Sequence, residues 1–244
     1  MARGKFLVVD GIDGVGKGVF LDTFVEEAKK SGKRVFDVHT YWKTHDHHPP
    51  AAEIAENYNV VHTSEPTFVG IGKLIREEFT AKKGRSYSPE AVAEAYALDR
   101  RILYEQLLLP VLEKGIDVYQ SRSVSTSIVY QRQSALDLGR EFSVDAILNI
   151  PGNAFCMQYP MDFLVVPTIA DVQEALQRVQ KREKDDNCIF ENLAFQLKIK
   201  EHYESKEFQK VFEDIGISVK YLDAGKSIEF SQQQAREFYE NFLA

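Results

Sequence analysis

The sequence predicts an α/β protein, a three-layer αβα sandwich with helices on both sides of a five-stranded parallel sheet. Short β-rich runs alternate with longer helical runs over the 244 residues, which is the pattern of parallel βαβ units. The run at residues 5–10 holds the continuous apolar stretch Phe6-Leu-Val-Val9 rather than an alternating pattern, as in a strand that is buried on both faces. In such sheets, ligands bind at the carboxyl ends of the strands.

The elements follow in order from their local patterns. Strands are expected at residues 5–10, 34–39, 60–62, 116–119 and 163–166, and residues 218–222 could add an edge strand. Helices are expected at residues 17–30, 71–79, 89–112, 125–138, 171–182, 193–212 and 231–242. Pro89 suits a helix start, whereas Pro110 interrupts the long helix that it begins.

Length and charge exclude several classes of protein. We expect residues 1–244 to form a single domain, since this length supports one large core. The net charge of −7 argues against a nucleic-acid polymer or an anionic membrane as partner. No apolar run could span a membrane and no signal peptide is visible, so a cytoplasmic location is expected. Cys156 and Cys188 are too few for a disulfide framework or a four-ligand zinc site.

The strongest motif is Gly11-Ile-Asp-Gly-Val-Gly-Lys17, which fits the phosphate-binding pattern G-x-x-x-x-G-K. Its glycines let backbone N–H groups turn toward an anion, and Lys17 reaches the outer phosphates of a nucleotide such as ATP. The alternative is a glycine-rich turn without a ligand. Gly18 replaces the Ser or Thr that would bind Mg²⁺, so the metal would be held by water and nucleotide oxygens. The predicted ATP-binding residues are Gly11, Asp13, Gly14, Val15, Gly16, Lys17, Gly18 and Val19.

Several segments in order resemble the thymidylate kinase family of P-loop nucleoside monophosphate kinases. They are residues 6–17, 63–67, 71–76, 93–100, 121–131 and 178–186. The resemblance implies a P-loop kinase domain that transfers the γ-phosphate of ATP to a nucleoside monophosphate, with dTMP as the expected acceptor and dTDP as the product. It also implies Mg²⁺ as a cofactor and a homodimer.

Four cationic residues are predicted to act in catalysis: Lys17, Arg122, Arg178 and Arg182. Arg122 follows a strand end, where its guanidinium can bridge donor and acceptor phosphates. Arg178 and Arg182 share a helix face and would belong to a lid at about residues 178–190. The alternatives are a surface salt bridge for Arg122 and a solvated basic face for the lid.

The predicted acceptor-binding residues are Asp13, Glu65, Tyr96, Arg100, Arg122 and Gln131. Asp13 would accept a hydrogen bond from the sugar hydroxyl, Tyr96 would stack on the base, and Arg100 would donate to a base carbonyl. Gln131 could offer its amide to the base edge. Turn stabilisation by Asp13, core packing of Tyr96 and simple surface polarity of Gln131 remain open alternatives.

The chain also departs from the family pattern. Ser121 stands where the family has Asp, Ser123 where it has Tyr, and Ser64 where Arg often precedes Glu-Pro. No direct metal ligand is assigned, but Asp10, Glu65 and Ser121 could hold Mg²⁺ through water. These departures leave two alternatives open: a kinase for another nucleotide or a deoxynucleoside, and a non-catalytic nucleotide-binding relative that acts through protein partners.

A histidine-rich insertion at residues 42–50 contains His45, Asp46, His47 and His48. The following Pro49 favours an extended surface loop, and a transition-metal site is the alternative.

Overall fold

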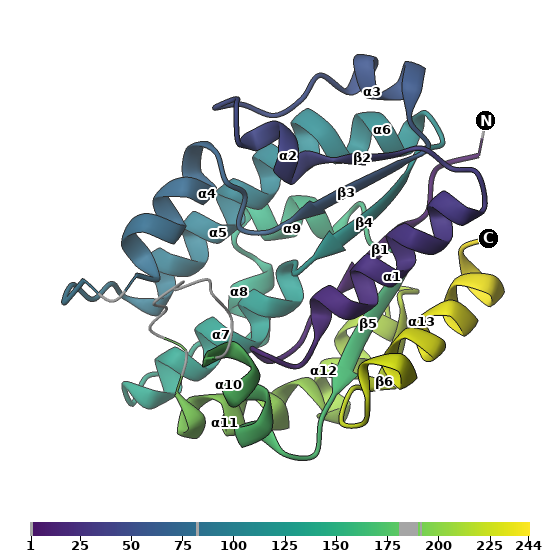
Figure 1. The fold of residues 1–244 in the computed structure, drawn as a ribbon. Coiled ribbons are helices and arrows are strands. Elements are labelled where there is room, and N and C mark those ends of the chain that lie inside the picture. Colours follow the sequence, from purple (N-terminus) through teal and green to yellow (C-terminus); the bar gives the residue numbers. More distant parts are fainter. Residues whose placement is uncertain (1, 82, 181–189, 191) are drawn as a thin grey trace.

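The computed structural model describes residues 2–81, 83–180, 190 and 192–244. Its strands form one parallel sheet in the order β2-β3-β4-β1-β5-β6, which confirms the predicted α/β class (Figure 1). The strands are β1 (Phe6–Val9), β2 (Val35–Asp37), β3 (Val60–Ser64), β4 (Asp117–Ser121), β5 (Phe163–Thr168) and β6 (Ser218–Asp223). The predicted count of five was too low by one, because the segment expected as an edge strand pairs with β5 along its whole length.

Helices cover both faces of the sheet (Figure 1). Helix α1 (Lys17–Lys30) and helix α13 (Ile228–Phe242) pack together on one face, where the ring centroids of Phe24 and Phe238 lie 5.6 Å apart. On the other face, α5 (Pro89–Leu103) packs against α7 (Val124–Asp137) and α9 (Pro151–Met157). The three layers therefore agree with the sandwich expected from the sequence.

The long helix expected at residues 89–112 continues through its proline. After α5, a π-helical turn (Tyr104–Leu108) leads directly into α6 (Leu109–Glu113). Pro110 has no N–H to donate, and the wider turn before it changes the register of the backbone bonds. A second π-helical turn (Ile75–Phe79) extends α4 (Gly70–Leu74) in the same way.

The structure contains short helices that the sequence did not predict. They are α2 (Val38–Trp42), α3 (Ala51–Asn57), α8 (Val144–Leu148) and α9. Asp37 caps α2 by accepting a hydrogen bond from the N–H of His39, so the second strand ends earlier than expected. The helix expected at residues 193–212 is two helices, α11 (Leu193–Tyr203) and α12 (Lys206–Glu213), because Ser205 caps a new start. Helix α10 (Val172–Gln180) precedes them.

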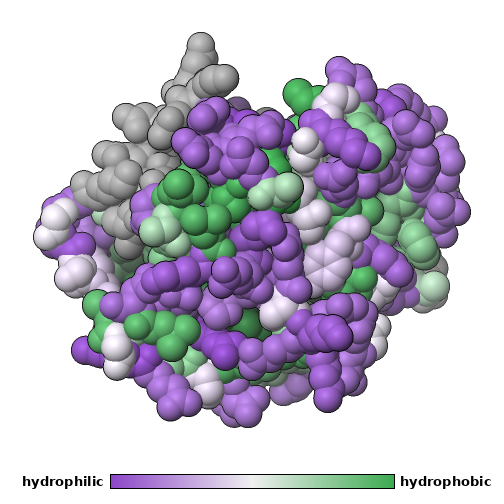
Figure 2. Space-filling model, turned by 90° about the horizontal axis from the view of Figure 1, so that it is seen from below, coloured by the Kyte–Doolittle hydropathy of each residue, from purple (hydrophilic) through white to green (hydrophobic). Residues whose placement is uncertain are grey.

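The main core runs along the sheet and draws on residues from Phe6 to Leu243. All four residues of β1 are fully buried, as the continuous apolar run predicted. On the face seen in Figure 2, hydrophilic side chains predominate and apolar side chains gather in separate patches. Within the described residues, we find no helix with the length and apolar character needed to cross a bilayer.

Candidate active site

The glycine loop connects β1 to α1 and curves around the side chain of Lys17. Gly11, Gly14 and Gly16 have φ angles of 150°, 76° and 104°, a region that glycine adopts without steric cost. The Nζ atom of Lys17 donates to the carbonyl oxygens of Gly11 at 2.9 Å and Ile12 at 2.8 Å. The ammonium group therefore lies inside the loop, where the phosphates of a nucleotide would meet it.

Two valines predicted to bind ATP have limited means to do so. The side chain of Val15 is fully buried, so only its backbone can face a phosphate. The N–H of Val19 donates to the carbonyl oxygen of Gly16 at 2.9 Å, within the first turn of α1. Gly18 is exposed at the same helix start.

Arg122 joins the loop to the carboxyl end of β4. It has a φ angle of 66°, which is unusual for a residue with a side chain. Its guanidinium pairs with Oδ1 of Asp13 and lies 3.8 Å from Oδ1 of Asp10. The Cζ atom also lies 5.2 Å from the ring centroid of Tyr130. This is the salt bridge that the sequence left as an alternative, but the Arg122 side chain is only 20% exposed and faces the loop.

Asp13 is held from two sides. Burial opposes its ionisation, but the charges of Arg122 and Lys17 outweigh that effect and lower its pKa. Gln196 of α11 accepts a hydrogen bond from the Asp13 N–H at 3.0 Å and donates to its Oδ2 at 3.1 Å. Sequence reasoning missed Gln196, because no local pattern links positions 183 residues apart. The contact of Asp13 with a sugar hydroxyl stays a prediction.

Asp10 is buried beneath the loop and anchors it. Its Oδ1 accepts hydrogen bonds from the N–H of Gly11 at 2.8 Å and the hydroxyl of Tyr203 at 3.0 Å. Its Oδ2 accepts from the hydroxyls of Ser125 at 2.5 Å and Thr126 at 2.7 Å. With four donors on two oxygens, Asp10 is placed to orient the loop, and its predicted role in holding metal-bound water remains untested.

A cleft of about 480 Å³ opens beside Lys17 at the carboxyl ends of β2, β3 and β4. This volume falls in the range of small-molecule sites. The cleft brings together many of the predicted residues: Asp13, Gly14, Gly16, Lys17, Gly18, Glu65, Ser121 and Arg122. Ser64, one of the departures from the family pattern, also lines it.

Glu65 and Arg100 form a buried ion pair. The Nε of Arg100 lies 2.7 Å from Oε2 of Glu65, and the two side chains are 0% and 2% exposed. The other guanidinium nitrogens of Arg100 donate to Oδ1 of Asn153 and to the hydroxyl of Ser127. Burial raises the pKa of Glu65 to about 7, against the opposing charge of Arg100. Gln120 donates to the second Glu65 oxygen at 3.0 Å.

The remaining predicted base-binding residues lie apart from the cleft. Tyr96 is buried in a small cluster with Ile75 and Val92, the core packing that the sequence left as an alternative. Gln131 is buried and lines a different cavity of about 300 Å³, in which Phe190 also takes part. No hydrogen-bond partner for Oε1 of Gln131 is found among the described residues. The base contacts of Tyr96, Arg100 and Gln131 stay predictions.

The predicted lid is described only in part. Arg178 lies on α10, where it donates to Oε1 of Glu174 at 2.7 Å and to the carbonyl oxygen of Ala224 at 3.1 Å. Arg182 and most of the segment at 178–190 lie outside the described residues. Cys188 also lies outside them. Cys156 is buried, and burial raises the pKa of its thiol.

The structure adds residues to the cleft that the sequence reasoning did not assign. Asp22 follows Gly18 by one helical turn, and a Cβ atom built at Gly18 would lie 3.9 Å from Oδ2 of Asp22. The i, i+4 spacing was the signal that could have found it. Phe68 and Arg76 also line the cleft, with the Arg76 Cζ 3.8 Å from the ring centroid of Phe68.

The histidine-rich segment packs around an aromatic ring. The ring of His45 stacks on Tyr41 at 3.8 Å between centroids, and Nε2 of His47 lies 3.0 Å from the Tyr41 hydroxyl. His45, Asp46 and His47 are exposed, whereas Trp42 and Pro49 of the same segment are buried.

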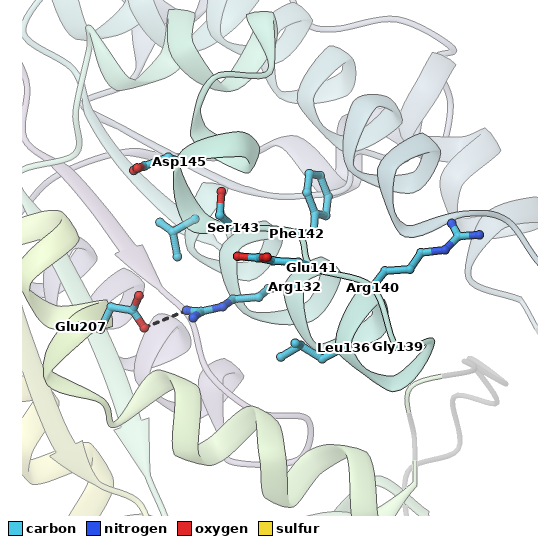
Figure 3. A pocket seen from close by; sticks show the side chains of 10 residues that line it. Arg132, Leu136, Gly139, Arg140, Glu141, Phe142, Ser143, Asp145 and Glu207 are labelled. Atoms are coloured by element: carbon cyan, nitrogen blue, oxygen red, sulfur yellow. Dashed lines mark hydrogen bonds and ion pairs between the residues drawn. The ribbon is translucent and has the colours of Figure 1, made fainter.

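A larger cavity, of about 660 Å³, lies elsewhere, between α7, α8 and α12. Figure 3 shows Arg132 of α7 pointing toward Glu207 of α12. Nη1 of Arg132 lies 2.8 Å from Oε2 of Glu207. Leu136 and Phe142 line the same cavity, but none of its lining residues belongs to the glycine loop. The smaller cleft beside Lys17 is therefore the better candidate for phosphate chemistry.

Comparisons with known proteins identify the family of the chain. The family model described as thymidylate kinase matches residues 51–235. A probable thymidylate kinase of Methanococcus vannielii is 30% identical over 199 residues, 82% of this chain and 76% of that protein. A thymidylate kinase of an Exiguobacterium species is 25% identical over 235 residues, 96% of this chain and 93% of that protein.

Among solved structures, thymidylate kinase from Candida albicans superposes with a TM-score of 0.64 at 18% identity, covering 99% of this chain and 93% of that one. At this identity the likeness supports the fold. Together with the family match over residues 51–235 and the relatives in sequence, these findings place the chain in the thymidylate kinase family.

Proposed function

We propose that this protein transfers the γ-phosphate of ATP to dTMP and releases ADP and dTDP. The observation that carries the proposal is the meeting of Lys17, Asp13 and Arg122 at one edge of the cleft. Phosphoryl transfer needs alignment and positive charge around three phosphate oxygens rather than covalent help from the protein. One ammonium and one guanidinium on either side of Asp13 supply that charge at a single place.

The donor phosphates fit the glycine loop. Lys17 now bonds to loop carbonyls, and a bound ATP would offer it phosphate oxygens in their place. Arg122 reaches the same region from β4, so its planar fork can hold two oxygens of the transferring group. Asp10 keeps the loop in this shape through its four hydrogen bonds.

The residues present fit a Mg²⁺ ion that is held through its waters. Asp22 places a carboxylate near the space where the hydroxyl of a Ser or Thr at position 18 would lie. Ser121 lines the same cleft and can hydrogen-bond to a metal-bound water. When bound, Mg²⁺ neutralises charge on the phosphates of the nucleotide.

The names of the relatives support dTMP over other acceptors, and the retained Lys17 and Arg122 support catalysis over a purely binding role. One sheet and one main core unite the described residues, which supports a single kinase domain over residues 1–244. The cytoplasmic location and the absence of a nucleic-acid partner remain predictions from the sequence, and the homodimer remains what the resemblance to the family implies.

An acceptor panel tests the proposal. ADP release from Mg·ATP should be measured with dTMP, dUMP, dCMP, dGMP, dAMP and the corresponding nucleosides. The expected result is the highest kcat/KM with dTMP and little turnover with thymidine. A preference for a nucleoside would point to a deoxynucleoside kinase, and no turnover with any acceptor would indicate a non-catalytic relative.

A further inference from the structure

Three potential metal ligands meet at the carboxyl ends of β2 and β3. Parallel pairing places Asp37 of β2 beside His62 of β3 in register. Paired residues on neighbouring strands point to the same face of the sheet. His39 follows Asp37 by two residues, in the first turn of α2, and the cap of that helix turns it back toward the strand. The local fold therefore brings two imidazoles and a carboxylate together.

The distances suit a single ion. Oδ1 of Asp37 lies 2.8 Å from Nδ1 of His39 and 3.8 Å from Nδ1 of His62. One ligand atom from each of the three residues lies within 4.8 Å of the others. Bonds of about 2.0–2.1 Å to tetrahedral Zn²⁺ place ligand atoms about 3.3 Å apart, a value between the two measured distances.

The surroundings of His39 resemble those of a metal ligand. Its second ring nitrogen, Nε2, lies 2.9 Å from the hydroxyl of Ser64, so the ring is oriented from the side away from Asp37. Ligating histidines usually bond through their other nitrogen in this way. Asp37 is oriented too, since its Oδ2 accepts a hydrogen bond from Thr40 at 3.0 Å.

All three residues line the cleft that contains Lys17 and Arg122. Three protein ligands leave at least one coordination position of a tetrahedral ion for water or for an anionic ligand. We propose that Asp37, His39 and His62 form a binding site for a first-row transition metal such as Zn²⁺, with its remaining position open to the cleft. The two imidazoles distinguish this site chemically from that of Mg²⁺, which prefers oxygen ligands.

Co²⁺ and Zn²⁺ titrations of the whole protein, after removal of metals by a chelator, test the site without any assay of activity. We expect one equivalent of Co²⁺ to give the visible absorption of a four- or five-coordinate ion with nitrogen ligands. Zn²⁺ should then abolish this absorption by displacement, whereas millimolar Mg²⁺ should leave it unchanged.

Single variants locate the ion. His62→Gln and Asp37→Asn should each weaken Co²⁺ binding by about tenfold or more. The matched control is the double variant His45→Gln/His47→Gln, which removes two exposed histidines outside the cluster and should leave the affinity unchanged. Since His62 lies within a strand, His39→Gln on the surface helix provides a second imidazole variant, and circular dichroism verifies that each variant is folded.

Two results would overturn the proposal. The first is the absence of saturable Co²⁺ and Zn²⁺ binding by the wild-type protein, which would leave the cluster as a hydrogen-bond network that orients α2. The second is a loss of binding in the His45/His47 control with no loss in folded cluster variants, which would place the ion on the exposed loop.

Discussion

Replacing Arg100 by methionine separates a structural role of this residue from a role in base recognition. Methionine keeps most of the apolar length of the side chain but removes every donor. The variant loses the 2.7 Å contact with Glu65 and the bonds to Asn153 and Ser127, all within the buried interior. Glu65 would keep its bond from Gln120 but lose its counter-charge.

The expected cost is large. Removing one partner of a buried ion pair destabilises a protein by about 3–5 kcal/mol. For a domain of this size, each kcal/mol lowers Tm by roughly 2–4 °C, so Tm should fall by about 6–20 °C. The matched control is Arg101→Met on the same helix. Arg101 pairs with Glu105 at 2.8 Å, but both side chains are more than 40% exposed, and such a pair contributes about 0.5 kcal/mol or less.

The stability lost in Arg100→Met should also depend on pH. Glu65 has a pKa near 7 in the folded protein, and removal of Arg100 would raise it further. At pH 6 the carboxyl group of Glu65 can therefore bind a proton, which removes the unpaired buried charge. At pH 8 the same protonation requires more free energy. Thermal and urea unfolding, followed by circular dichroism at both pH values, should show the greater destabilisation at pH 8.

One outcome would refute this reasoning. If Arg100→Met kept its Tm within about 2 °C of the wild type at pH 8 while raising the KM for dTMP, the ion pair would contribute little to stability. Arg100 would then act by contacting the base, as its place in the resemblance to the family implies.

Three further predictions concern single side chains. Glu65→Gln should flatten the pH dependence of the free energy of unfolding. In the wild type, the raised pKa of Glu65 adds stability that is fully present below pH 4.5, the ordinary pKa of the group, and that is lost as the pH rises through about 7. Urea unfolding at several pH values measures this, and a free energy of unfolding that changes with pH as steeply in the variant as in the wild type would contradict the prediction. Lys17→Ala should lower kcat by about 10²–10³-fold without unfolding the protein, whereas Lys30→Ala, at the exposed end of the same helix, should not. A kcat of Lys17→Ala equal to that of the wild type would contradict the kinase proposal. Asp22→Asn should raise the Mg²⁺ concentration that gives half-maximal rate, and the control Glu26→Gln, one turn later, should leave it unchanged. A fall in kcat at saturating Mg²⁺ with no change in that concentration would remove Asp22 from the metal site.

The parts of the fold that follow from local patterns were predictable. The strand before the glycine loop is a continuous apolar run, and helix α1 spans the residues that its apolar spacing indicated. The short helices were not predictable in this way. Helix α9, for example, has only seven residues, too few for a periodic signal, and Gly152 within it allows contact with the backbone of Ala97 that a Cβ would block.

The site residues that belong to one sequence motif were predictable, whereas contacts between segments far apart in the sequence were not. Lys17 and Asp13 belong to the glycine loop, so sequence spacing alone located them. Gln196 reaches Asp13 from 183 residues away, and a single sequence contains no trace of that contact. The Asp37–His62 pair depends on the register of two strands, which periodicity does not specify.

At two of the positions that depart from the family pattern, other side chains of the cleft lie close by. Gly18 lacks a hydroxyl, and the carboxylate of Asp22 lies close to the vacated space. Ser64 lacks a guanidinium, and its hydroxyl instead meets the ring of His39, which sits in the cluster with potential metal ligands. In both places, polar or ionisable groups from nearby positions line the cleft where the expected side chain is missing. The carboxylate of Asp22 suits a metal-bound water rather than a phosphate, so the positive charge for phosphate binding would come from Lys17, Arg76 and Arg122, which line the same cleft.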